Sequence, residues 1–136
     1  MAAQFKLNII TPEKIFFEGE TSRLIVRTTE GDLGILAHHT SLVSSLPSGP
    51  LRIMQEDGSF RTAALSSGFL KVGGNKVSII ANAVEWADEI DIEWAKRSEA
   101  DARTKLDTLK DKHQLDLAEL KLKRALNRIS VHSLMK

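Results

Sequence analysis

Residues 68–81 read GFLKVGGNKVSIIA, and this stretch decides the fold of the N-terminal part of the chain. Two segments rich in apolar residues, 68–72 and 76–81, flank the sequence Gly73-Gly74-Asn75. Glycine and asparagine tolerate the positive φ angles of a tight hairpin turn, and the flanking segments have the composition of strands. The stretch therefore predicts two antiparallel strands joined by a short turn.

Similar patterns recur on the N-terminal side of this hairpin. Residues 5–9 alternate apolar and polar side chains with the period of a half-buried strand. Residues 23–28 predict another strand, and residues 51–53 and 60–65 flank a turn of sequence EDGS at 56–59. Strands that recur about every eight to twelve residues are typical of an antiparallel sandwich or barrel.

The composition changes near residue 85. All eight glycines and all three prolines lie before this position. The segment 85–136 carries eleven of the 19 Lys and Arg residues and eleven of the 18 Asp and Glu residues. A charged segment without helix breakers favours helix. We therefore expect an α+β fold, with an antiparallel β-sandwich over residues 1–84 and a two-helix hairpin over residues 85–136.

Two apolar stripes with the spacing of a helical face support the hairpin. The first stripe comprises Ala95, Ala102, Leu106 and Leu109, and the second comprises Leu115, Ala118, Leu122, Ala125 and Ile129. Asp88 or Asp91 is expected to cap the first helix. The polar residues 110–113 separate the stripes and contain neither glycine nor proline.

Because nothing in residues 110–113 stops a helix, two arrangements stay open. The segment can form a docked hairpin, or it can run as one helix over residues 90–131, about 63 Å long. Burial of its leucines and isoleucine contributes on the order of 10–15 kcal/mol in total. Ordering roughly forty residues costs several tens of kcal/mol before helix hydrogen bonds offset part of it. The segment is therefore expected to depend on the sandwich, a ligand or a partner.

The composition excludes several classes of protein. A net charge of +1 provides no global basic field for binding nucleic acid. The absence of cysteine excludes disulfides, thiolate metal sites and cysteine nucleophiles. No apolar run reaches the roughly 18 residues of a membrane span, and no basic region precedes the first apolar residues as in a secretion signal.

Few side chains have the spacing of a reactive site. His38 and His39 lie in a predicted loop, where adjacent side chains point apart and no third ligand is suitably spaced. No catalytic residue and no metal site is therefore predicted. Trp86 and Trp94, at the boundary of the two parts, are expected to pack the helices against the sandwich.

A cationic helix face is the other candidate for a functional site. Lys121, Arg124 and Arg128 lie at positions i, i+3 and i+7 of the second predicted helix. They form either a solvated surface or a clamp for an acidic protein loop or for phosphates.

Three stretches together resemble the epsilon subunits of bacterial F-type ATP synthases, along the whole chain. They are TEGDLGIL at 29–36 followed by His39, LSSGFLKV at 65–72, and LKRALNRISV at 122–131. Their order and spacing make the resemblance specific. It implies a non-catalytic subunit of the central stalk at the cytoplasmic face of the bacterial membrane, attached to that membrane only through the complex.

The resemblance also implies partners. The sandwich would bind the gamma subunit and rest on the c-ring, and so couple proton translocation to ATP synthesis on the beta subunits. Asp32 and His39 would contact the ring or the stalk, although the family usually has Glu at the position of Asp32 and Pro-Gly where this chain has Ala37-His38. The helices would extend along gamma and inhibit ATP hydrolysis. The residues expected to contact an acidic segment of beta are Lys121, Lys123, Arg124 and Arg128.

Some members of this family bind ATP between the folded helices, through the motif Ile/Leu-Asp-x-x-Arg-Ala. Residues 90–95 match it with Trp94 in place of the arginine, and Asp101 replaces a further basic residue. The remaining site residues match and are Glu85, Asp91, Arg124 and Arg128. Each charge-assisted contact contributes about 1.5–3 kcal/mol, so ATP binding is expected to be weak or absent and no other cofactor is expected. The alternative function is a solitary nucleotide-sensing or adaptor module of the same fold, which would need no stable complex with gamma.

Overall fold

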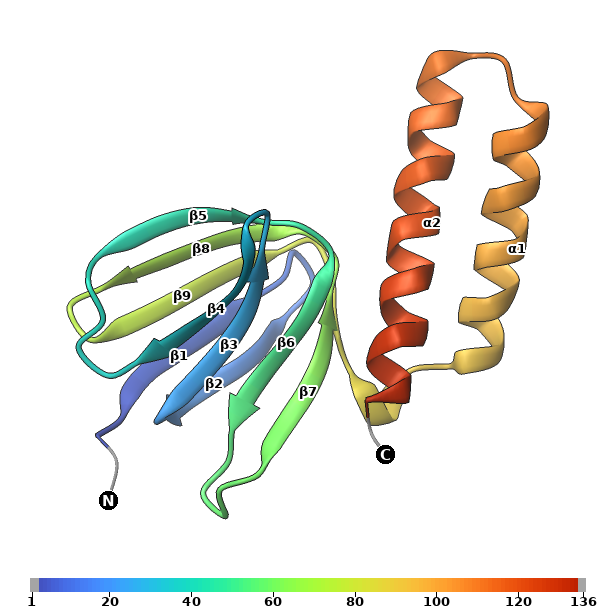
Figure 1. Cartoon of the computed structure of the whole chain (residues 1–136). Coiled ribbons are helices and arrows are strands. Elements are labelled where there is room, and N and C mark those ends of the chain that lie inside the picture. The colour runs from blue at the N-terminus through green and yellow to red at the C-terminus, as the bar shows by residue number, and fades with distance from the viewer. Residues whose placement is uncertain (1–2, 135–136) are drawn as a thin grey trace.

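The computed structural model describes residues 3–134, which form a β-sandwich followed by a helical hairpin (Figure 1). The first five-stranded sheet has the order β2-β1-β9-β8-β5, and the second has the order β10-β7-β6-β3-β4. The predicted fold class is confirmed. The strands are β1 (Phe5–Ile10), β2 (Ile15–Thr21), β3 (Arg23–Thr28), β4 (Gly31–Leu36), β5 (Leu42–Leu46), β6 (Gly49–Met54), β7 (Phe60–Leu65), β8 (Gly68–Gly73), β9 (Lys76–Ala81) and β10 (Val84–Trp86).

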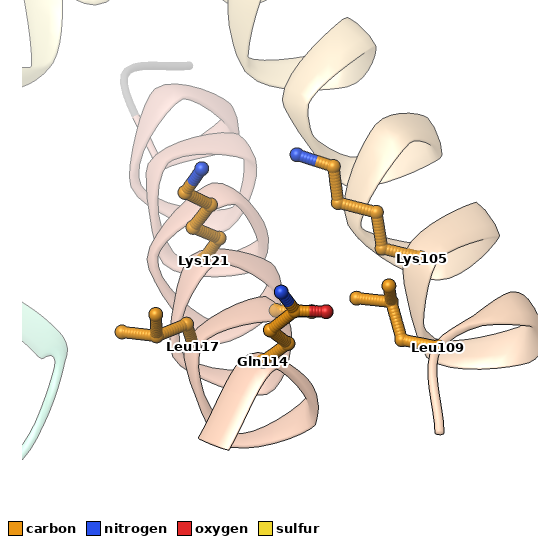
Figure 2. A pocket seen from close by; sticks show the side chains of 6 residues that line it. Lys105, Leu109, Gln114, Leu117 and Lys121 are labelled. Carbon is orange, nitrogen blue, oxygen red and sulfur yellow. The ribbon is translucent and has the colours of Figure 1, made fainter. Parts of the chain in front are cut away.

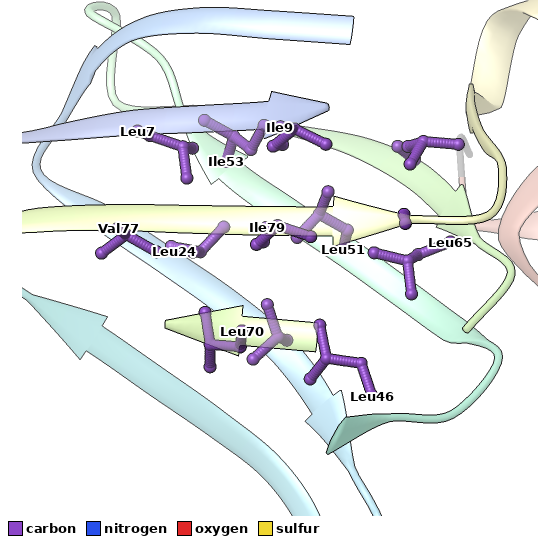
Figure 3. Close-up of a cluster of buried hydrophobic side chains, with 14 of the residues drawn as sticks. Leu7, Ile9, Leu24, Leu46, Leu51, Ile53, Leu65, Leu70, Val77 and Ile79 are labelled. Atoms are coloured by element: carbon purple, nitrogen blue, oxygen red, sulfur yellow. The ribbon is translucent and has the colours of Figure 1, made fainter. Parts of the chain in front are cut away.

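The core lies between the two sheets, because alternate side chains of each strand point inward (Figure 3). Leu7 and Ile9 of β1 meet Leu24 of β3 and Leu51 of β6 in this layer, and all four are fully buried. Burial of each such side chain contributes about 1.5–3 kcal/mol. The sandwich therefore has a core of its own, independent of the helices.

The β8–β9 hairpin forms as predicted. Its two turn residues, Gly74 and Asn75, have φ angles of 59° and 56°, as the turn type that matches strand twist requires. The Asn75 side chain donates a hydrogen bond to the Gln4 carbonyl (3.0 Å) and accepts one from the His38 backbone N–H (2.8 Å). This one side chain therefore ties the hairpin tip to the N-terminal segment and to the loop after β4.

The sheets differ from the predicted antiparallel arrangement in one strand pair, and they contain strands that were not predicted. β1 pairs parallel with β9, with Leu7 beside Val77 and Ile9 beside Ile79, so that buried residues lie next to one another. A parallel pair needs a long crossover connection, which local sequence patterns do not reveal. β2, β4, β5 and β10 were not predicted, because their alternation is short or interrupted by glycine or polar residues.

Two antiparallel helices, α1 (Ile92–Thr108) and α2 (Lys112–Ser133), follow a short 3-10 helix, η1 (Ala87–Glu89). Asp91, rather than Asp88, caps α1 by accepting a hydrogen bond from the Trp94 N–H at 3.0 Å. Asp111 caps α2 in the same way, through the Gln114 N–H at 3.1 Å. The structure thus has the hairpin rather than the single long helix. Alanines of both predicted stripes are buried between the helices: Ala95, Ala102, Ala118 and Ala125.

The expectation that both tryptophans pack the helices against the sandwich is wrong. Trp86 belongs to the sandwich core, where its ring centroid lies 4.5 Å from that of Phe16 and the Arg61 guanidinium lies 3.7 Å from its ring. Trp94 is 48% exposed on α1. The position of Trp86 depends on where β10 ends, and that of Trp94 on the rotation of α1 about its axis. The sequence determines neither.

Within residues 3–134, neither helix is long and apolar enough to cross a membrane.

Candidate functional site

The junction between hairpin and sandwich is small and contains one buried amide. Asn127 of α2 is only 9% exposed, and its Nδ2 donates hydrogen bonds to the carbonyls of Leu65 (3.0 Å) and Gly49 (3.2 Å). These two residues are register partners of β7 and β6. The apolar part of the junction consists of small or medium side chains: Ala64, Ala87, Ile90 and Val131. So little apolar area gives modest stabilisation, and the amide supplies the direction of docking.

A cationic groove of about 400 Å³ follows one flank of the hairpin. Its lining residues come from α1 and α2: Trp94, Ser98, Asp101, Lys121, Arg124 and Arg128. The helical spacing of three and four residues places these side chains on facing flanks. The face proposed from Lys121, Arg124 and Arg128 therefore exists, and it lines a groove rather than an open surface.

Arg128 connects the groove to the sandwich. Its Nε lies 3.2 Å from Glu85 Oε1 of β10, and its guanidinium lies 4.9 Å from the centre of the Trp94 ring. Arg128 Nε and Glu85 Oε1 form an ion pair but not a hydrogen bond, since Glu85 Oε1 is buried without a hydrogen-bond partner. Arg124 Nε is also buried without a hydrogen-bond partner. Of Glu85 and Arg124, only Arg124 lines the groove.

The predicted nucleotide-site residues are brought together only in part. Arg124 and Arg128 line the groove, and Glu85 pairs with Arg128 from β10. Asp91 lies at the start of α1, where its carboxylate already caps the helix. Asp101 lines the groove and forms an ion pair with Lys105 at 3.2 Å. A carboxylate stands where a phosphate would need a cation, which disfavours a polyphosphate ligand.

A second groove, of about 280 Å³, lies nearer the tip of the hairpin and was not predicted (Figure 2). Apolar and polar side chains of both helices line it: Lys105, Leu109, Gln114, Leu117, Ala118 and Lys121. Lys121 lines both grooves. The sequence offered one signal for this groove, a leucine at position 117 that lies outside both predicted stripes.

The four predicted inhibitory cations do not share a face in the docked hairpin. Lys121, Arg124 and Arg128 line the groove, whereas Lys123 pairs with Glu119 along another face of α2, at 3.7 Å. Residues two apart on a helix do not face one direction. A partner that contacts all four would have to surround α2.

Asp32 lies at the start of β4, and His39 lies beyond its other end. Asp32 is next to the first residue of the strand and accepts a hydrogen bond from Arg27 Nε at 2.7 Å. This hydrogen bond, with the charges of Arg27 and Arg52, holds the pKa of Asp32 below its ordinary value. His39 lies after the end of the strand, and its Nδ1 contacts the Thr40 carbonyl oxygen at 2.7 Å. The structure therefore does not bring the two residues together.

An apolar row crosses the outer face of the first sheet and was also missed. The register places Ile15 beside Ile10, Ile10 beside Ile80, and Ile80 beside Phe69. All four side chains are exposed, Phe69 by 61%. Exposed apolar residues that adjoin in this way are a feature of interaction surfaces. The register of β2, β1, β9 and β8 brings these four residues together, and no local pattern in the sequence indicates that register.

Comparisons with known proteins agree on one relationship. Two family models match: "ATP synthase, Delta/Epsilon chain, beta-sandwich domain" over residues 4–87, and "ATP synthase, Delta/Epsilon chain, long alpha-helix domain" over residues 88–133. The ATP synthase epsilon chain of Ruminococcus albus is 48% identical over 130 residues, 95% of this chain and 96% of the relative. That of Clostridium novyi is 40% identical over 131 residues, 96% and 99% of the two chains.

Solved structures agree on the fold. A chain in the structure of the Euglena gracilis mitochondrial ATP synthase matches with a TM-score of 0.84 at 24% identity, over 100% of this chain and 84% of that chain. A chain of the Tetrahymena thermophila mitochondrial ATP synthase central stalk and c-ring matches with a TM-score of 0.62 at 19% identity, over 96% and 98%.

Proposed function

The chain belongs to the ATP synthase delta/epsilon chain family, and from this membership we propose that it works as the epsilon-type subunit of the central stalk of a bacterial F-type ATP synthase. The observation that carries the proposal is the match of both family domains, in order, over nearly the whole chain. In this role the chain transmits rotation between the c-ring and the catalytic subunits at the cytoplasmic face of the membrane. It performs no chemistry itself.

The outer face of the first sheet supports a contact with gamma. The row of Ile15, Ile10, Ile80 and Phe69 spans four adjacent strands on a core that is already complete without it. Covering such a row removes apolar area from water, which contributes about 25 cal/mol per Å². We assign this face to gamma.

Asp32 supports a polar contact with the c-ring. Its carboxylate is half-exposed at the end of the sandwich and is kept ionised by Arg27. Because His39 lies beyond the other end of β4, we assign Asp32 to the ring and His39 to the stalk.

The hairpin supports a regulatory role. Its junction with the sandwich has one buried amide, one partly exposed ion pair between Arg128 and Glu85, and a few small or medium apolar side chains. Release therefore costs little compared with unfolding the sandwich. Lys121 and Lys123 are already exposed in the docked hairpin, and release would also free Arg124 and Arg128, so that positive charge would surround α2. We infer that an acidic segment of beta binds this charge and that ATP hydrolysis is inhibited in that state.

ATP is a poor ligand in this scheme. Trp94 and Asp101 line the groove where phosphates would need cations, and Asp91 is occupied as a helix cap. We therefore propose that the docked state is held by the protein's own contacts rather than by nucleotide.

Truncation in the assembled complex tests the proposal. A chain ending at residue 88 keeps all ten strands of the sandwich and should still assemble with gamma and the c-ring. The complex should then hydrolyse ATP faster than the complex with the full chain. Failure to co-purify with gamma would overturn the stalk role, and unchanged hydrolysis in an assembled complex would overturn the inhibitory role.

A further inference from the structure

A continuous series of contacts joins Asp32 in β4 to Asn127 in α2 and passes through the start of β6. Asp32 and Arg27 are direct partners in the β3–β4 register and share the 2.7 Å hydrogen bond. The stem of the Arg27 side chain lies over Gly49. The carbonyl of Gly49 in turn accepts the hydrogen bond from Asn127.

The Arg27 side chain leaves no room for a side chain at position 49. A methyl group at this position would stand 2.6 Å from Arg27 Cβ and 2.9 Å from Arg27 Cγ. Carbon atoms pack at about 3.5–4.0 Å, so only glycine fits beneath the Arg27 stem as it now lies. A movement of that stem therefore acts directly on the backbone at Gly49.

The backbone at Gly49 is one of the two anchors of the hairpin. Asn127 Nδ2 reaches Gly49 and Leu65 at once, and the bond to Gly49 is the longer, at 3.2 Å. Hydrogen bonds of this kind weaken beyond about 3.2 Å. A small displacement at the start of β6 is therefore enough to weaken the contact of Asn127.

We propose that this series couples the surroundings of Asp32 to the docking of the hairpin. A partner group that binds the Asp32 carboxylate competes with Arg27, releases the Arg27 stem to move against Gly49, and so weakens the Asn127 anchor. The inference rests on the proposed function, in which Asp32 meets the ring and the hairpin is released. Because coupling is reciprocal, a docked hairpin also favours the Arg27–Asp32 pair.

The size of the effect follows from the exposure of the pair. Couplings between sites are typically 5–150-fold in an equilibrium constant. Arg27 and Asp32 are both 46% exposed, so solvent screens their interaction. We expect a change near the lower end, about fivefold in the ratio of released to docked hairpin.

Thiol labelling of the full-length chain measures that ratio. The chain has no cysteine, so Val131→Cys introduces a single thiol at a fully buried position of the junction. Its rate of reaction with a thiol reagent is proportional to the released population when docking is fast. A separate Leu70→Cys chain, with its thiol in the sandwich core, reports global unfolding.

Asp32→Asn should raise the labelling rate at position 131 about fivefold and leave the rate at position 70 unchanged. Glu30→Gln is the matched control, because Glu30 lies in the same turn, is exposed, and has no salt bridge within residues 3–134. It should leave both rates unchanged. In an Asn127→Ala background, Asp32→Asn should have no further effect.

Two results would overturn the coupling. One is an Asp32→Asn rate equal to that of Glu30→Gln, and the other is a full Asp32→Asn effect that persists without Asn127. Gly49→Ala should raise the rate at position 131 by itself, but the conclusion does not depend on that variant folding. Since these measurements use the isolated chain, a negative result beside faster hydrolysis by the truncated complex rejects the coupling and leaves the proposed function standing.

Discussion

The side-chain nitrogen of Asn127, in the last helix, lies 3.0 Å from the carbonyl oxygen of Leu65, in the second sheet. This buried contact spans 62 positions of the chain and fixes how the hairpin meets the sandwich. The side chains around it are small, so the hairpin is held by direction more than by area.

Asn127→Ala should weaken docking by about 1–3 kcal/mol, because two hydrogen bonds to backbone carbonyls are lost at a buried position. The measurement is amide hydrogen exchange, which should become faster in α2 and stay unchanged in β8 and β9. Ser130→Ala, at an exposed position of the same helix, is the control. Equal exchange in the two variants would mean that the amide does not anchor the hairpin.

Arg128→Gln should free Trp94, since the guanidinium lies over its ring. A cation–π contact at an exposed site contributes about 0.5–1 kcal/mol. The indole resonance of Trp94 should shift in the NMR spectrum while that of Trp86 stays in place, because Trp86 packs in the sandwich. Lys96→Gln, an exposed residue of α1, should move neither resonance.

ATP should bind the natural chain more weakly than micromolar. Trp94→Arg combined with Asp101→Lys should strengthen binding more than tenfold, because each restored charge-assisted contact contributes about 1.5–3 kcal/mol. Titration calorimetry measures both constants. Glu93→Gln combined with Asp107→Lys adds the same positive charge at exposed positions outside the groove and should leave the affinity unchanged. Micromolar affinity in the natural chain would contradict the prediction.

The pKa of Asp32 should lie below its ordinary value, because Arg27 donates a hydrogen bond to the ionised form. Its folded-state pKa is depressed, so the stabilisation is present above the unfolded-state pKa and is lost as the pH falls through the folded-state value. The relevant window therefore lies below about pH 4. Arg27→Gln should raise the pKa of Asp32 in an NMR titration. The pKa of Asp57, which Ser59 lowers, should not change.

Phe69→Ser should reduce the affinity for gamma without unfolding the sandwich, since this ring stands on the outer face and outside the core. A pull-down with gamma and a thermal melt of the isolated chain give the two readouts. Lys71→Ser, two residues further along β8 on the same face, is the control. A lower melting temperature for Phe69→Ser with undiminished gamma binding would show that the ring has a structural role instead.

Local features of the sequence were sufficient for most elements. The Gly74-Asn75 turn, the split of glycines and prolines at residue 85, and the alanine spacing of the two helices each depend on neighbours within a few positions. Turn geometry and helix periodicity are set by such neighbours. The break between the helices was less clear from the sequence. The connection contains no glycine or proline, and Asp111 marks it only as the N-cap of α2.

The site was predictable as a set of residues but not as an arrangement. Arg124 and Arg128 were identified from helical spacing, yet the approach of Arg128 to Glu85 depends on how α2 meets β10. Asp32 and His39 are seven positions apart in sequence, and the straight run of β4 separates them. Asn127 gave no signal, because a polar residue on a charged helix reads as solvated.

The sequence by itself therefore determined both helices and six of the ten strands in residues 3–134, since those preferences act over a turn or a hairpin. Only the tertiary structure decided that β1 lies beside β9, that Asn127 is buried against Gly49 and Leu65, and that Arg27 reaches from Asp32 to Gly49. These contacts join residues far apart in the chain. They form when the two sheets close on their shared core, and no local preference specifies them.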